Sequence, residues 1–209
     1  MIRAPALARL LAIGACALAL SGCISLLPKT KPAQLYRFGD TPATAAATTA
    51  PPQIIGVYRA NGVFQTESAG DRILTLSAGK VAYIARARWV APASVLFDHA
   101  VLEAFDAMGG PVRLISRGEQ GKADYALRLD VRTFETRYDA GPRSAPTVVV
   151  RVRAALSKAD RSNAGEQIFD ANVKASDNRV SAIVSAYDQA LAQVLGKLTA
   201  WTAANVAAG

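Results

Sequence analysis

Hydrophobic and polar residues alternate along much of the chain between residues 53 and 174, a pattern typical of strands with one buried face. The alternating segments are 53–60, 71–78, 80–90, 124–138, 147–157 and 167–174, and a short strand is also expected at 34–38. Segment 124–138 changes parity beyond Arg132, which predicts either a bulge or a long twisted ribbon. Turn residues such as Gly141-Pro142 and Asn163-Ala164-Gly165 separate consecutive segments. We therefore expect a curved antiparallel sheet that is half-buried on one face.

Two other segments show the helical period. The first begins near Pro92 and ends at Gly109-Gly110, with Phe97, Val101 and Phe105 on one face. The second covers 179–203, where Asp177 or Asn178 is a plausible N-cap. Its apolar stripe comprises Val180, Ile183, Val184, Tyr187, Leu191, Val194, Leu195 and Leu198. Two helices packed against one curved antiparallel sheet give an α+β fold, a two-layer sandwich.

The N-terminus has the pattern of an export signal. Arg3 and Arg9 precede an apolar run over 10–20, which is shorter than the ~20 residues of a membrane-spanning helix. The run ends in Leu20-Ser21-Gly22-Cys23, which resembles the lipobox of bacterial lipoproteins. We expect residues 1–22 to be removed and Cys23 to carry acyl chains such as palmitate. The alternative is an ordinary secretory signal followed by a chance cysteine.

The remaining chain predicts a short tether and one domain. Residues 23–33 form the lipidated tether, and residues 34–209 form the domain, with a low-complexity Ala/Thr/Pro insertion at 40–53. Ile24 follows the cysteine where aspartate is associated with retention in the inner membrane. The sequence thus favours the periplasmic face of the outer membrane over the inner membrane.

The residue content argues against catalysis. The 209 residues hold one His and two Cys, and we find no nucleophile elbow, phosphate loop or cluster of metal ligands. We therefore predict no catalytic residue, no metal and no cofactor. Asp130 and Asp170 could face one another across strands as a glycosidase's carboxylates do, but ion pairs with neighbouring arginines are the expected arrangement. His99 is expected at the surface.

The net charge of +8 has one prominent source in the strands. Six arginines occupy the outward parity of the predicted strands: Arg86, Arg88, Arg128, Arg132, Arg151 and Arg153. They are interpreted either as a solvated face or as a surface for an acidic protein partner or anionic lipid headgroups. Trp89, at a strand-to-helix junction, either fills the seam between sheet and helix or anchors an interface. Export excludes nucleic acid as a partner.

Several of these features resemble one known family. The features that carry the resemblance follow one another in the order and spacing of that family. They are the lipobox Cys23, Leu35-Tyr36-Arg37-Phe38, Arg88-Trp89 followed by Pro92, a strand from Ala123-Asp124-Tyr125 to Phe134, and a terminal helix with Tyr187. The family is the ABC-type transport auxiliary lipoprotein components, which include the paraquat-inducible protein C group. The chain departs from the family pattern at the 40–53 insertion and at Val90-Ala91-Pro92, where an acidic residue often precedes the proline.

The resemblance implies a non-enzymatic periplasmic accessory of a lipid-transporting ABC system. In such systems a mammalian-cell-entry (MCE) domain protein forms the periplasmic conduit, and a separate permease and ATPase drive transport. The implied partners are the membrane through the lipid anchor, the MCE-domain protein with its permease and ATPase, and phospholipid, while homo-oligomer formation stays open. The alternative is a pilotin-like or envelope-assembly lipoprotein with no transporter. An enzyme acting on envelope polymers is a third hypothesis.

Overall fold

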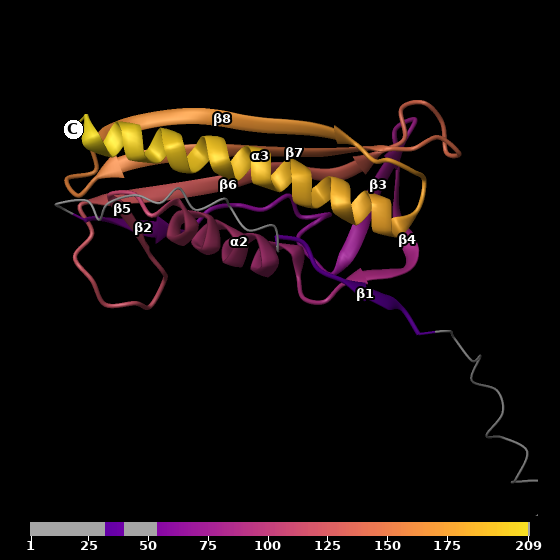
Figure 1. Cartoon of the computed structure of the whole chain (residues 1–209), viewed down its shortest axis with the longest axis horizontal. Coiled ribbons are helices and arrows are strands. Elements are labelled where there is room, and N and C mark those ends of the chain that lie inside the picture. Colours follow the sequence, from indigo (N-terminus) through magenta and orange to yellow (C-terminus); the bar gives the residue numbers. More distant parts are fainter. Residues whose placement is uncertain (1–31, 40–53, 209) are drawn as a thin grey trace, which may run out of the picture. The chain divides into compact units, whose positions relative to one another are not determined.

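The computed structural model describes residues 32–39 and 54–208, and the described residues from Ala33 onward belong to one α+β unit (Figure 1). The strands are β1 (Gln34–Tyr36), β2 (Ile55–Ala60), β3 (Arg72–Ser77), β4 (Lys80–Trp89), β5 (Val112–Ile115), β6 (Tyr125–Arg137), β7 (Thr147–Lys158) and β8 (Asn163–Lys174). The helices are α2 (Ala93–Met108) and α3 (Val180–Ala207). The predicted fold class, a sheet packed against two helices, is confirmed. Cys23, the signal segment and the 40–53 insertion lie outside the described residues.

The sheet is mixed, so the expectation of a purely antiparallel sheet is wrong. The long strands β6, β7 and β8 do pair antiparallel. The other edge of β6 is shared by two strands that run parallel to it, β2 along Tyr125 to Arg128 at its start and β3 along Thr136 and Arg137 at its end. Between them the chain continues alongside β6 without reversing, with Phe64 bridged to Val131. The sheet therefore forks beside the middle of β6.

Each arm of the fork carries further strands. β5 extends the first arm parallel to β2, and it was not predicted because its four residues are too few to show a period. β4 extends the second arm antiparallel to β3, and β1 pairs parallel with β4. Between the two arms, the segment around Phe64 hydrogen-bonds to Val131 of β6 without forming a regular strand.

The helices bury one face of this sheet. α3 packs on β7 and β8 and contacts α2, which packs beside β5 (Figure 1). Trp89, Phe134 and Tyr187 are buried together, with the Trp89 and Tyr187 ring centroids 5.2 Å apart. Thr136 donates a hydrogen bond of 3.2 Å to the Tyr187 hydroxyl, and burial raises the pKa of Tyr187 well above its ordinary value. This core joins β4, β6 and α3.

The structure confirms one prediction about the strands and contradicts others. The bulge in β6 is confirmed, since the register shifts between Val131 and Thr133. In β4 the expected alternation fails, because Arg86 adopts a positive φ of 58° where the register with β3 is irregular. The turn expected at 163–165 is wrong, because β8 already begins at Asn163 and the chain turns before it.

The expected N-cap of α3 is also wrong. Arg179 occupies the N-cap position, in an extended conformation and without a side-chain cap. Asp177 instead accepts the Asn178 backbone N–H at 2.7 Å and lies 3.5 Å from Arg179 Nε, so its carboxylate does not reach the helix amides. Within residues 32–39 and 54–208, no helix has the length and hydrophobicity to cross a membrane.

Candidate functional site

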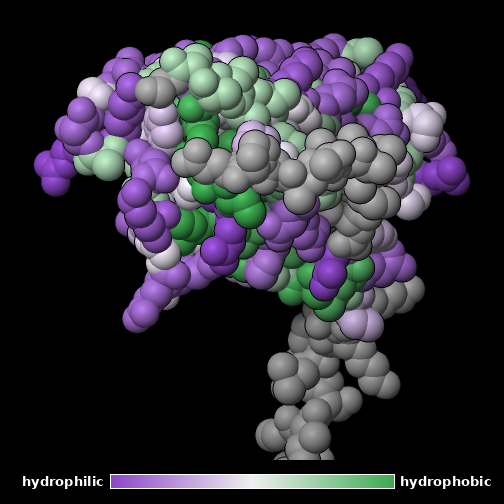
Figure 2. Space-filling view, turned by 60° about the vertical axis from the view of Figure 1, so that its left-hand side comes forward, coloured by the Kyte–Doolittle hydropathy of each residue, from purple (hydrophilic) through white to green (hydrophobic). Residues whose placement is uncertain are grey.

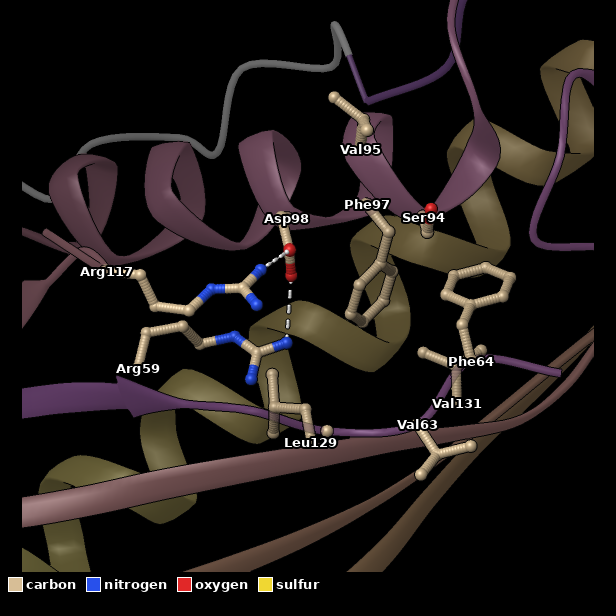
Figure 3. Close-up of a pocket in the computed structure, with 11 residues that line it drawn as sticks. Arg59, Val63, Phe64, Ser94, Val95, Phe97, Asp98, Arg117, Leu129 and Val131 are labelled. Atoms are coloured by element: carbon tan, nitrogen blue, oxygen red, sulfur yellow. Dashed lines mark hydrogen bonds and ion pairs between the residues drawn. The ribbon is translucent and has the colours of Figure 1, made fainter. Parts of the chain in front are cut away.

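A pocket of about 270 Å³ opens at the fork, between the first turns of α2 and the middle of β6 (Figure 3). Three of the residues that line it are charged: Arg59, Asp98 and Arg117. The other lining residues are Gly62, Val63, Phe64, Ser94, Val95, Phe97, Leu129 and Val131. The site therefore combines an ionic group with a largely apolar wall.

The alternation of β2 places Arg59 in the pocket. Val57 and Arg59 share the buried face of the strand, while Tyr58 between them is exposed. Beyond the strand, Gly62 passes so close to β6 that an added Cβ would lie 1.7 Å from the Leu129 carbonyl oxygen. The Val131 N–H donates to the Val63 carbonyl at 2.7 Å, which holds this segment along β6. The gap between β2 and β3 is thus walled by backbone that follows β6.

Three elements meet at the ionic group. Asp98 on α2 accepts a hydrogen bond from Arg59 Nη2 at 2.9 Å and another from Arg117 Nη2 at 2.7 Å (Figure 3). Arg117 follows β5 and also donates to Asn61 Oδ1 at 2.8 Å. One carboxylate therefore serves two guanidinium groups, one on each of its oxygens.

Arg59 is the buried member of this group. Its side chain is 9% exposed, whereas that of Arg117 is 51% exposed. Burial lowers the pKa of Arg59, and the charge of Asp98 partly offsets that effect. Arg59 Nη1 donates to the Ala60 carbonyl at 2.6 Å, but its Nε is buried with no hydrogen-bond partner among the described residues. Burying the Arg59 guanidinium costs desolvation free energy, and its contacts offset only part of that cost.

The apolar wall extends from the interior to the surface. Phe97 on α2 and Phe64 meet edge to face, with ring centroids 5.9 Å apart. Leu129 and Val131 are buried at the floor. At the surface the side chains of Val63 and Val95 remain 60% and 44% exposed. Apart from the ionic group and Ser94, the lining of the pocket is therefore apolar both in the interior and at the surface.

Elsewhere on the surface, exposed apolar residues are spread over several elements. They include Leu35 on β1, Val81 on β4 and Ile168 on β8. On the face drawn in Figure 2, hydrophobic residues gather in patches that hydrophilic residues separate. At the pocket, by contrast, the exposed side chains of Val63 and Val95 line the same cavity as the buried Arg59.

The predicted arginine face is divided. Arg86 and Arg88 lie on β4, which β3 separates from β6, and Arg88 pairs with Asp71 at 2.7 Å. Arg128, Arg151 and Arg153 lie on the face of β6 and β7 that points away from the helices. Arg132 is exposed at the bulge of β6. The six residues do not form one continuous patch.

Acidic residues are interleaved with the arginines on β6 to β8. Asp130 accepts hydrogen bonds from Arg128 Nε at 2.9 Å and Arg153 Nη1 at 3.2 Å, and Arg153 also forms a two-pronged pair with Glu166. Asp170 lies directly opposite Arg151 across the β7–β8 ladder. Burial alone would raise the pKa of Asp130, but these hydrogen bonds and one from the Val63 N–H hold that pKa below its ordinary value.

The remaining candidates occupy clear positions. Trp89 is 2% exposed, and its ring centroid lies 4.8 Å from that of Phe38 in an edge-to-face contact, so it fills the core. His99 is exposed on α2. The part of the chain that the structure describes holds no group of three or more His, Cys, Asp or Glu side chains that could bind a metal.

The sequence interpretation missed the three charged residues of the pocket. Arg59 had a signal, because the alternation that buries Val57 places an arginine on the same face. Asp98 lies beside the buried stripe of α2, and Arg117 lies in a loop where no period applies. Their convergence depends on the parallel pairing of β5 with β2, which the sequence pattern did not predict.

The sequence matches one family model, the ABC-type transport auxiliary lipoprotein component, over residues 69–198. The chain belongs to this family. The matched span includes Asp98 and Arg117 of the pocket and ends before the last turns of α3, while Arg59 precedes it. No curated protein matches the sequence.

Solved structures share the fold of this family member. Protein XCC0632 from Xanthomonas campestris, described as a member of the DUF330 family, is 24% identical and aligns with a TM-score of 0.72 over 84% of this chain and 98% of its own. An uncharacterized protein is 13% identical, with a TM-score of 0.61 over 84% and 99%. Hypothetical protein CT253 from Chlamydia trachomatis is 10% identical, with a TM-score of 0.53 over 75% and 99%. At these identities the likeness concerns the fold.

Proposed function

We propose that the protein is a lipid-anchored, non-enzymatic accessory of an MCE-type ABC lipid transport system. The observation that carries this proposal is the match to the auxiliary lipoprotein family in a chain whose N-terminus ends its apolar run in Leu20-Ser21-Gly22-Cys23. Cys23 carries the lipid and holds the domain at the periplasmic face of the outer membrane. The MCE-domain protein, with its permease and ATPase, is the partner.

The chemistry of the pocket supports an accessory role over an enzymatic one. Its polar side chains are two arginines, one aspartate and Ser94. Asp98 is engaged by both arginines, and the described lining residues include no histidine that could activate the Ser94 hydroxyl. These groups are suited to holding an anion rather than to transferring a proton.

For docking we propose the face of β6 to β8 that points away from the helices. Arg132 and Arg151 are exposed there, and the Asp130 pairs hold the strands without covering these two side chains. The occupant is an acidic surface of the MCE-domain protein, because exposed arginines favour such a surface electrostatically. Contact with anionic headgroups instead would appear as binding to vesicles without the protein partner.

The anchor is tested by labelling cells with a palmitate analogue. Wild type and a Ser25→Ala control are expected to incorporate the label, and Cys23→Ala is expected to lose it, because the thiol is the attachment atom. Label retained on Cys23→Ala would contradict the assignment of the anchor.

The transport role is tested by affinity purification from membranes that contain the candidate MCE-domain protein, permease and ATPase. We expect the three proteins to co-purify with the tagged lipoprotein. Arg151→Gln is expected to reduce the amount of the three proteins that is recovered, and to make that amount less dependent on the salt concentration. Lys197→Gln, which removes an exposed cation from α3, is the matched control. Recovery of none of the three proteins with the wild type would refute the proposed role.

A further inference from the structure

The pocket at the fork is short of negative charge. Arg59 and Arg117 lie side by side and both reach Asp98, which is the only carboxylate among its described lining residues (Figure 3). Two cations and one anion leave one positive charge beside an apolar cavity. The buried cation Arg59 is paired with Asp98, so the surplus positive charge belongs to the half-exposed Arg117, whose guanidinium is free to attract an additional anion.

A purely structural role explains the arrangement poorly. One arginine would suffice to tie α2 to β2 through Asp98, and well-packed apolar residues would join the same elements at least as well as a buried ion pair. Here the second arginine, Arg117, is half exposed and reaches the same carboxylate from the loop after β5. The Nε of the buried Arg59 has no hydrogen-bond partner among the described residues, although its two Nη atoms donate to Ala60 and Asp98.

The walls restrict the chemistry of the missing anion. A hydrated inorganic anion would gain little from Phe64 and Phe97 or from the exposed Val63 and Val95 at the rim. An anionic group attached to a hydrocarbon chain would use both halves of the site. The cavity of about 270 Å³ is slightly smaller than the ~300–1,000 Å³ of typical ligand pockets, so it suits a headgroup and only the start of one chain.

We propose that this pocket binds the headgroup of a single-chain anionic amphiphile. The carboxylate or phosphate accepts hydrogen bonds from Arg117, with the buried charge of Arg59 behind it. The first part of the chain lies against Phe64 and Phe97 and leaves the pocket between Val63 and Val95. Asp98 holds the two guanidinium groups in place and is not displaced.

The inference deepens the proposed function, because it gives the accessory protein a ligand of its own. It rests on that function only for the location at which the protein encounters the ligand. The two can fail separately. Partner recovery tests the transport role without reference to the pocket, and labelling of the pocket tests the ligand without any partner protein.

The experiment uses the mature lipoprotein in phosphatidylcholine nanodiscs and a dodecanoate that carries a photoactivatable diazirine. A trimethylammonium probe with the same chain measures the contribution of charge. After illumination, labelled peptides are mapped by mass spectrometry. We expect the carboxylate probe to label the peptides that contain Val63-Phe64 and Val95 to Phe97, and the cationic probe to leave them at background.

Variants test whether the labelling depends on the pocket or on the protein surface in general. Arg117→Gln is chosen over a change at Arg59 because it leaves the buried Arg59–Asp98 pair intact. Losing its charge-assisted hydrogen bonds is expected to reduce labelling about tenfold or more. Val95→Glu, which places a negative charge at the rim, is expected to do the same. Val90→Glu alters a valine of similar exposure outside the pocket lining and should label as wild type.

Competition identifies the kind of ligand. Unlabelled dodecanoate should displace the probe, and inorganic phosphate at the same concentration should not. Displacement by phosphate alone would overturn the assignment of an amphiphile. Equal labelling by the two probes, or labelling that neither Arg117→Gln nor Val95→Glu reduces, would overturn the site itself.

Discussion

Two clusters in this protein use the same parts, two arginines around one aspartate, with different results. On the face away from the helices, Arg128 and Arg153 share Asp130, and Glu166 pairs with Arg153. In the pocket, Arg59 and Arg117 share Asp98, and the described lining residues include no second carboxylate. The first cluster is balanced in charge, and the second retains one positive charge.

The two clusters also differ in which member is buried. The Asp130 side chain is 8% exposed and its arginines are 50% and 27% exposed, so water reaches both cations. In the pocket the cation is the buried member, with Arg59 at 9% and Asp98 at 33% exposure. A buried carboxylate between hydrated arginines is satisfied by the protein alone, whereas a buried arginine beside a cavity leaves a place for a ligand.

The largest effect is expected from removing the carboxylate of the pocket. Asp98→Ala leaves Arg59 buried without an anion, which costs about 3–5 kcal/mol when one partner of a buried ion pair is removed. Unfolding of the mature protein by urea, followed through tryptophan fluorescence, measures this loss. The double variant Arg59→Met with Asp98→Leu is expected to recover much of it, because the charge and its partner leave together.

This result would also test the contrast between the clusters. If Asp98→Ala destabilised the protein no more than the corresponding change at Asp130, then Arg59 would be adequately solvated, and the pocket would not differ from the outer face.

A smaller effect, with a pH dependence, is expected at Asp130. Asp130→Asn removes a charge that accepts hydrogen bonds from Arg128, Arg153 and the Val63 N–H, for a loss of about 1–3 kcal/mol at pH 7. Because the folded state lowers the pKa of Asp130, its stabilising contribution is complete above the unfolded value of about 3.9. That contribution disappears as the pH falls through the folded value.

The difference in stability between wild type and Asp130→Asn should therefore narrow below about pH 4. Urea unfolding at pH 7 and pH 3 measures it. A difference that stays constant or grows toward pH 3 would show that the carboxylate is not held in its ionised form by the folded state.

Much of the fold could be predicted because local periodicity decides it. The stripe of α3, the face of α2 and the parity change in β6 each reflect a repeat that the chain carries within a single element. Strand pairing is a relation between distant segments, and the same alternation is compatible with parallel or antiparallel neighbours. The position of β2 and β3 on one edge of β6 therefore could not be deduced from the alternation.

The pocket escaped prediction for the same reason. Arg59, Asp98 and Arg117 come from a strand, a helix and a loop, and they meet only because β5 lies beside β2. The outer arginines were easier to place, since alternation along β6 and β7 assigns Arg128, Arg151 and Arg153 to one face. The acids between them were visible in the sequence as well, but their pairing with particular arginines needed the register of the strands.

The smallest effect on stability is expected at Arg151, and it sharpens the contrast within the outer face. Arg151 is exposed on β7 opposite Asp170, whereas Arg153 in the same strand joins Asp130 to Glu166. Arg151→Gln should change the free energy of unfolding by less than about 0.5 kcal/mol, as exposed substitutions usually do. Arg153→Gln should lower the melting temperature measurably, because Asp130 then keeps only one of its two arginines. Equal melting temperatures for the two variants would show that the Arg153 bridges add nothing to the fold, and that both arginines are available to a partner.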